Sequence, residues 1–132
     1  MAYRLSQRSE KALIGVHPDL VACVRRALEL TTQDFTVVEG VRSLDRQREL
    51  VAKGASKTLK SRHLRQADGY GHAVDLYPYY GRSVQVDAPY ERFYDISRAM
   101  KVAAAELGIQ ITWGGDWKGA WDTPHYQLER GR

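Results

Sequence analysis

The chain has 132 residues, of which 43% are hydrophobic and 27% are charged, and it carries a formal net charge of +4. This composition is typical of a globular protein and excludes a disordered one, and the length predicts a single domain over residues 1–132. The charge favours anionic partners, but no run of Lys and Arg marks a nucleic-acid-binding arm, so we expect no nucleic-acid partner.

The sequence offers no segment that would enter or cross a membrane. No apolar stretch approaches the length of a membrane span, and the opening residues, MAYRLSQRSEKALIGV, carry charges throughout, unlike a signal peptide. We therefore expect no stable membrane insertion. The one cysteine, Cys23, cannot form an internal disulfide and lies in an apolar helical pattern, which predicts a buried thiol.

The first half of the chain contains signals for two helices and one strand. Pro18 suits the first position of a helix, which we expect to continue to about Leu30. The β-branched and aromatic run at 34–40 predicts a strand. Ser43 can cap a second helix over 44–53, and the glycine that follows would end it.

A long loop and the clearest helix follow. Residues 54–71 are small or polar and have no period, which predicts a loop, and long loops in compact domains are usually functional. Residues 72–79 form an expected strand that Pro78 ends. Apolar residues recur every three or four positions over 89–108, which predicts a helix that stops at its final glycine.

The last part of the chain alternates short strands with a loop. We expect strands at 109–113 and 125–129, joined by a loop at 114–124. Helices and strands are mixed without strict alternation, and the last strands are close in sequence. The fold class is therefore predicted as α+β, with a small, mostly antiparallel sheet packed with about three helices.

The histidines are the candidate metal ligands. Catalytic zinc sites usually take three ligands from His, Asp, Glu or Cys, and this chain has four histidines. His17 begins a helix beside a proline, which favours a structural or surface role. The other three, His63, His72 and His125, fall at junctions of loops and strands, where a rigid sheet can hold ligands.

Asp75 is the strongest carboxylate candidate. Because side chains alternate along a strand, Asp75 shares a face with Ala73 and Tyr77 but not with His72. A carboxylate on an apolar strand face is costly unless it is paired or bound to a metal. His63 can fold back across the loop to join it, so Asp75 and His63 form the more plausible pair of ligands.

His125 would supply a third ligand, with Asp122 three residues before it. A carboxylate near a metal ligand can accept a proton from an attacking water. The spacing alone is weak evidence, because Asp-x-x-His occurs often by chance and a loop histidine is more often an exposed residue.

These residues resemble a known family. Ser61, His63, Gly71, Ala73 and Asp75 match the signature S-x-H-x-x-G-x-A-x-D, and Asp122 and His125 match its downstream carboxylate-x-x-His. The signature is that of zinc peptidases that cut peptidoglycan stem peptides, including D-alanyl-D-alanine carboxypeptidases and phage L-alanyl-D-glutamate endopeptidases. The resemblance covers about residues 40–128 and is strongest to the phage endolysin branch.

The resemblance implies a fold similar to Hedgehog and D,D-peptidase proteins, with one zinc ion per chain bound at the edge of the sheet. It implies zinc ligation by His63, Asp75 and His125. Asp122 would be the general base, and Arg42 would stabilise negative charge on the oxyanion or on a substrate carboxylate. The residues that we expect to line the substrate site are Gln47, Ser61, Tyr77 and Trp121.

The endolysin branch further implies a biological setting. The partner would be bacterial peptidoglycan, the protein would act as a monomer without a separate wall-binding domain, and it would stay in the host cytoplasm until a holin releases it. Two rival functions remain open: a D,D- or L,D-carboxypeptidase that trims stem peptides, and a non-catalytic wall-binding module.

One departure from the signature affects the ligand set. The family has two residues between the histidine and the glycine, whereas this chain has the seven residues 64–70. We expect the additional residues to form a longer loop over the site. The alternative is a shifted register in which His72 replaces His63 as the ligand.

Overall fold

The computed structural model describes residues 3–56, 58 and 60–129. The elements in chain order are α1 (Gln7–Ala12), α2 (Pro18–Leu30), β1 (Phe35–Glu39), α3 (Leu44–Ala52), β2 (Ala73–Tyr80), β3 (Ser83–Val84), α4 (Tyr90–Leu107), β4 (Ile111–Trp113), the 3-10 helix η1 (Gly114–Asp116) and β5 (His125–Leu128). The predicted α+β class is confirmed.

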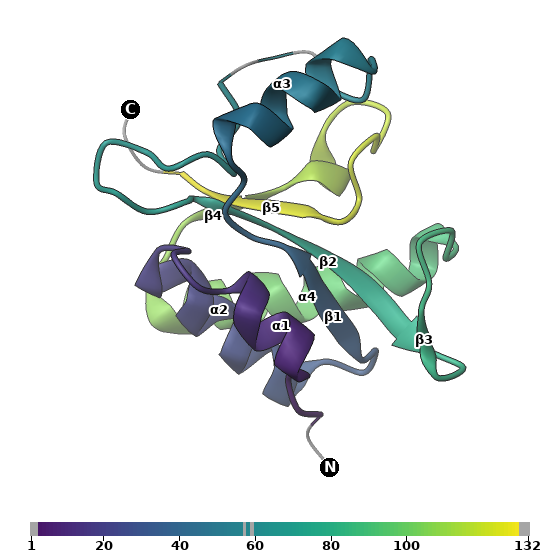
Figure 1. Ribbon diagram of the computed structural model, residues 1–132. Helices are drawn as coiled ribbons and strands as arrows, with labels where there is room; N and C mark the ends of the chain where they lie inside the picture. The colour runs from purple at the N-terminus through teal and green to yellow at the C-terminus, as the bar shows by residue number, and fades with distance from the viewer. Residues whose placement is uncertain (1–2, 57, 59, 130–132) are drawn as a thin grey trace.

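The strands form one sheet in the order β1-β2-β5-β4, with β3 paired to the far end of β2. Every pair among these strands is antiparallel. Helices α1, α2 and α4 cover one face of the sheet, whereas α3 and the connection from β4 to β5 lie on the other side (Figure 1). The two inner strands, β2 and β5, therefore have one face in the core and one face toward α3.

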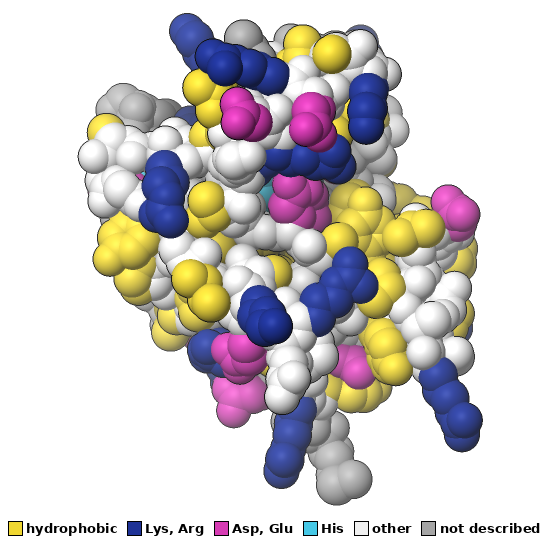
Figure 2. Space-filling view, viewed as in Figure 1, with side chains coloured by type: hydrophobic (Ala, Val, Ile, Leu, Met, Phe, Trp, Pro, Cys, Tyr) yellow, Lys and Arg dark blue, Asp and Glu magenta, His cyan; other side chains and the backbone are white. Residues whose placement is uncertain are grey.

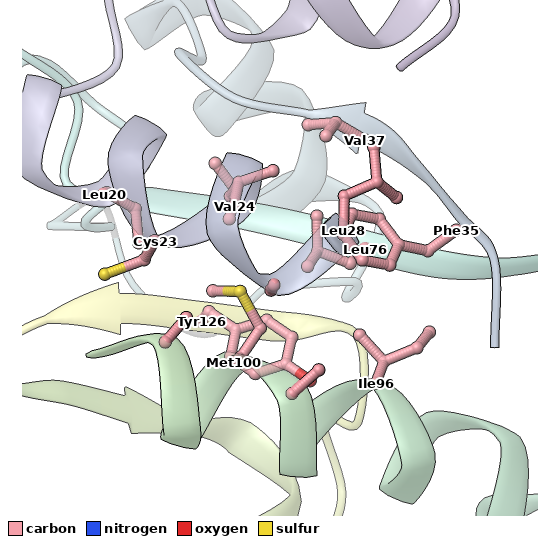
Figure 3. Close-up of a cluster of buried hydrophobic side chains, with 14 of the residues drawn as sticks. Leu20, Cys23, Val24, Leu28, Phe35, Val37, Leu76, Ile96, Met100 and Tyr126 are labelled. Atoms are coloured by element: carbon pink, nitrogen blue, oxygen red, sulfur yellow. The ribbon is translucent and has the colours of Figure 1, made fainter. Parts of the chain in front are cut away.

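The hydrophobic core lies between the sheet and the helix pair α2–α4 (Figure 3). Leu20 and Val24 of α2 and Met100 of α4 are completely buried, as is Leu76 of β2. Alternation along β2 sends Leu76 into this core and its neighbour Asp75 to the opposite face. Burial of the apolar residues thus fixes the orientation of β2, which places its polar residues on the face opposite the core.

The expected start and stop signals are present in the structure. Ser43 caps α3 by accepting a hydrogen bond from the backbone N–H of Arg46, and Gly108 ends α4 with a φ of 68°. Cys23 is buried, as predicted. Helix α1 was not predicted, because its six residues complete less than two turns and show little periodicity.

The expectation that Pro78 ends its strand is wrong, because β2 continues to Tyr80. The Pro78 carbonyl accepts a hydrogen bond from Gln85, next to β3, whereas the N–H of Tyr79 bonds to Asp34, next to β1. The N–H that proline lacks would face the β3 side, where pairing spans only two residues, so the ladder to β1 stays intact.

None of the helices in the described part of the chain is long and apolar enough to cross a membrane.

Candidate active site

The inner strands place two of the candidate ligands opposite each other. Asp75 of β2 and His125, the first residue of β5, are register partners. Both point away from the core, because their neighbours Val74 and Tyr126 are buried in it. The site thus lies over the two central strands, at the end of β5, and not on an edge strand.

His63 reaches the same place from the loop before β2. Its backbone N–H bonds to the Ser61 hydroxyl at 3.1 Å, and its carbonyl accepts the N–H of Arg42 at 2.8 Å. Its ring nitrogen Nε2 lies 3.3 Å from Oδ1 of Asp75. Hydrogen bonds therefore hold His63 at both its backbone N–H and its carbonyl, and the side chain is 3% exposed.

The second ring nitrogen of each histidine bonds to an acceptor. Nδ1 of His63 lies 2.9 Å from the carbonyl of Gly40, and Nε2 of His125 lies 2.8 Å from Oε1 of Gln127. Since carbonyl oxygens only accept, these nitrogens carry the protons. The nitrogens that face Asp75 then present lone pairs, which is the arrangement found in metal-ligating histidines.

The distances between the three donor atoms fit a metal ion. Nδ1 of His125 lies 3.5 Å from Oδ1 of Asp75, and Nε2 of His63 lies 3.3 Å from the same oxygen. All three donor atoms lie within 4.8 Å of one another. Zinc bonds of this kind give tetrahedral ligand separations of about 3.4 Å. Oδ1 of Asp75 is buried and has no hydrogen-bond partner among the described residues. The donor set therefore fits zinc.

The pKa shifts of Asp75 and His125 show that the site without a metal favours positive charge next to Asp75. Burial raises the pKa of Asp75, but the two histidines outweigh it and hold that pKa well below its usual range. Burial lowers the pKa of His125, but the Asp75 carboxylate outweighs it and raises that pKa. A proton on His125 thus supplies the positive charge that a metal would supply, so the two compete.

Asp122 lies beside this group without joining it. Its Oδ2 is 3.9 Å from Nδ1 of His125, and the side chain is half-buried. Burial raises the pKa of Asp122, and so does the charge of Asp75, although His125 acts in the opposite direction. Gly114 makes this position possible, because a Cβ there would lie 2.1 Å from the Asp122 carbonyl.

Arg42 lies on the other side of Asp75. Its guanidinium forms a two-point ion pair with Glu39 at 2.6 and 2.9 Å, and its NH2 group is 4.0 Å from Oδ2 of Asp75. Oε1 of Gln47 accepts a further bond from Arg42 at 2.7 Å. The pair with Glu39 raises the pKa of Arg42 despite its burial, which acts the other way.

Gln47 and Ser61 both contact the guanidinium of Arg42. Gln47 is completely buried and donates to Ser56 and to the Thr58 carbonyl, so it exposes no surface to a substrate. We therefore correct its expected role from substrate contact to positioning of Arg42. Ser61 is half-buried and lies 3.5 Å from Arg42 in addition to its bond with His63.

The remaining expected site residues are Tyr77 and Trp121. Tyr77 lies on the same strand face as Asp75, where burial and three nearby carboxylates raise its pKa to about 12. Trp121 is exposed and stacks on Trp117, whose ring contacts that of His125. From the side shown in Figure 2, little histidine surface is visible between acidic and basic side chains.

His72 does not replace His63. It bonds to Asp68 at 2.8 Å, and His17 lies 3.8 Å from the same carboxylate oxygen. We name these three residues the Asp68 cluster. The cluster fastens the inserted residues 64–70 to the segment before α2, so the expectation that they form a loop over the site is wrong. The loop before β2 extends away from the β4–β5 connection (Figure 1).

Three contacts of the site were missed from the sequence. Gln127 follows His125 by two residues on a strand, so the strand period alone could have placed both on one face. Glu39 and the carbonyl of Gly40 had no comparable signal, because their contacts depend on the path of the chain between β1 and α3.

Comparisons with known proteins were made on the whole chain. The family described as phage L-alanyl-D-glutamate peptidase matches residues 1–131. The L-alanyl-D-glutamate peptidase of Escherichia phage T5 is 34% identical over 134 residues, covering 99% of this chain and 93% of that protein. The enzyme of the same name from Listeria phage A118 is 33% identical over 95 residues, covering 72% of this chain and 30% of that protein.

Two solved structures are also similar. The L-Ala D-Glu endopeptidase ChiX of Serratia marcescens has a TM-score of 0.84 and 45% identity, covering 96% of this chain and 90% of that chain. The vancomycin-resistance D,D-dipeptidase VanXYg has a TM-score of 0.52 and 16% identity, covering 86% of this chain and 50% of that chain. The second likeness concerns the fold alone.

Proposed function

The chain belongs to the phage L-alanyl-D-glutamate peptidase family, and from this membership we propose that it is a zinc-dependent peptidoglycan endopeptidase. The bond cleaved is that between L-alanine and D-glutamate in the stem peptide. The observation that carries the zinc dependence is the group of His63, Asp75 and His125, whose donor atoms converge within 4.8 Å. The proposal assigns the activity to one domain spanning residues 1–132.

The donor set determines what a metal would contribute. His63, Asp75 and His125 would hold one zinc ion through Nε2, Oδ1 and Nδ1. A zinc ion held by these residues would lower the pKa of its bound water to about 7. The bonds from the two histidines to Gly40 and Gln127 keep both rings in the required tautomer and orientation.

Asp122 acts as the general base. Its carboxylate lies next to the ligand group, and a pKa above the ordinary value makes it a better proton acceptor at neutral pH. It takes the proton of the attacking water and then donates it to the nitrogen of the leaving D-glutamate. No second acid is needed, because the proton gained in the first step is the one lost in the second.

Arg42 provides fixed positive charge on the opposite side of Asp75. Its guanidinium is held by Glu39 and Gln47, so it does not reorganise as negative charge develops on the peptide carbonyl oxygen. Action as a monomer and holin-dependent release from the host cytoplasm remain parts of the proposal.

The test is a digestion of purified peptidoglycan with identification of the new termini by mass spectrometry. The wild type should release new N-terminal D-glutamate, lose this activity on chelation and recover it with added zinc. Asp122→Asn should bind zinc but cleave at least about 100-fold more slowly. Release of free D-alanine would instead indicate a carboxypeptidase. Binding to the wall without any cleavage would indicate a wall-binding module.

A further inference from the structure

Two tryptophans, the half-buried Trp117 and the exposed Trp121, form an aromatic surface next to His125. The rings of Trp117 and Trp121 stack with centroids 4.9 Å apart, and the Trp117 ring lies 5.3 Å from that of His125. Trp121 is 71% exposed. An apolar patch of two stacked rings beside a candidate active site is a candidate ligand-binding surface. We name this pair the tryptophan platform.

The turn that carries the platform has an unfavourable backbone. Gly119 has a φ of 83° and Ala120 a φ of 46°, and the N–H of Ala120 bonds to the Trp117 carbonyl at 2.7 Å. The left-handed region is disfavoured for alanine because its Cβ approaches the following carbonyl oxygen. The turn brings the two rings together without burying Trp121, so core packing does not explain why the strain is kept.

The charges around Asp75 differ between its two sides. Arg42 lies near Oδ2, whereas Asp122 lies next to His125, on the side of the platform. The D-glutamate of a stem peptide carries a free carboxylate, which Arg42 attracts, while the nitrogen of the same residue faces Asp122. The other half of the substrate, alanine amide-linked to the lactyl group of muramic acid, is uncharged and thus favours the platform side.

We propose that the tryptophan platform binds the pyranose ring of the N-acetylmuramic acid residue that carries the stem peptide. This inference rests on the proposed function, which places the cleaved bond one alanine away from the lactyl group. Alanine and the lactyl group together span about 7 Å, by the length of two extended residues. A sugar at that distance lies within reach of rings that begin next to His125 and continue outward to Trp121.

The face of a sugar ring and the face of the Trp121 indole ring are chemically complementary. One face of a pyranose ring presents C–H groups with partial positive charge, and the face of an indole ring is electron-rich. Because Trp117 backs Trp121 from one side, the outer face of Trp121 is pre-positioned for such contact. The platform would make the enzyme prefer stem peptides that are still attached to the glycan.

The test compares two substrates that share the cleaved bond. One is the N-acetylmuramoyl tripeptide, and in the other an acetyl group replaces the muramoyl group. We expect the wild type to prefer the first in kcat/KM, and Trp121→Ala to reduce this preference about 3- to 10-fold through KM. Trp121→Phe should keep most of the preference, whereas Trp121→Leu, apolar but not aromatic, should lose it. Tyr94→Ala, which removes an exposed aromatic ring from α4, is the matched control.

Two results would overturn the inference: no preference in the wild type, or an equal loss on both substrates in Trp121→Ala. If the wild type cleaves neither substrate, the proposed function has failed, and calorimetric titration with the same two compounds still decides the question. Tighter binding of the muramoyl compound by the wild type than by Trp121→Ala would support the platform. Equal binding by both proteins would refute it.

Discussion

Gln127 should control metal affinity without touching the metal. Its Oε1 accepts the Nε2 proton of His125 at 2.8 Å, which directs the lone pair of Nδ1 toward Asp75. Losing such a partner typically costs 10- to 100-fold in metal affinity. Because Gln127 is only half-buried, water can replace part of the bond, so we expect Gln127→Met to weaken zinc binding about 10-fold, or about 1.4 kcal/mol.

The assay is a competition titration with a chromophoric zinc chelator at constant pH. Gln110→Met makes the same chemical change at an exposed position, and it should leave the affinity unchanged. Among the described residues, Gln110 bonds only through its backbone carbonyl, to the N–H of Glu129. Gln127→Glu should bind zinc at least as tightly as the wild type, since a carboxylate is a stronger acceptor. Equal affinities for wild type and Gln127→Met would refute ligation through Nδ1 as we describe it.

Three further experiments test other parts of the structure. Gly114→Ala places a Cβ 2.1 Å from the Asp122 carbonyl, so we expect about a 100-fold loss of kcat/KM with zinc still bound; unchanged kinetics would contradict this placement of the base. The Tyr70 N–H and the two histidines of the Asp68 cluster lower the pKa of Asp68, so its contribution to stability is complete above pH ~3.9 and is lost below it. In urea titrations the free energy of unfolding of the wild type should therefore exceed that of Asp68→Asn at neutral pH, and this difference should shrink in acid. A difference that does not change with pH would contradict this role of Asp68. Burial raises the pKa of the Cys23 thiol to about 11, so a thiol reagent at pH 8 should label only unfolded protein, and rapid labelling of the native state would show that the core is open.

The sequence was most informative where local chemistry decides the structure. Caps at Ser43 and Gly108 gave the helix ends, and strand alternation placed Asp75 on the face opposite the core. Strand alternation also favoured His63 over His72 as the partner of Asp75, and the resemblance to a family added the zinc ligation, although the longer loop left His72 as an alternative. Helix α1 and strand β3 were missed since six and two residues carry too little periodicity.

The contacts that could not be predicted are those set by the chain path rather than by local pattern. The ion pair of Arg42 with Glu39 crosses the turn between β1 and α3. The bond from His63 to the Gly40 carbonyl joins a side chain to a backbone atom 23 residues away. Backbone acceptors carry no residue-specific signal, so half of the support for the ligand histidines is invisible in a single sequence.

The insertion of residues 64–70 shows why the ligand register survives a change in loop length. Two backbone bonds fix the chain next to this loop. The bond from the His72 N–H to the Arg62 carbonyl closes the base of the loop, and the bond from the Arg42 N–H to the His63 carbonyl anchors His63 to the segment after β1. Both lie between the inserted residues and the site, so the position of His63 relative to Asp75 does not depend on how many residues follow. Lengthening a loop whose ends are already fixed costs little entropy, and the Asp68 cluster then determines where the additional residues lie.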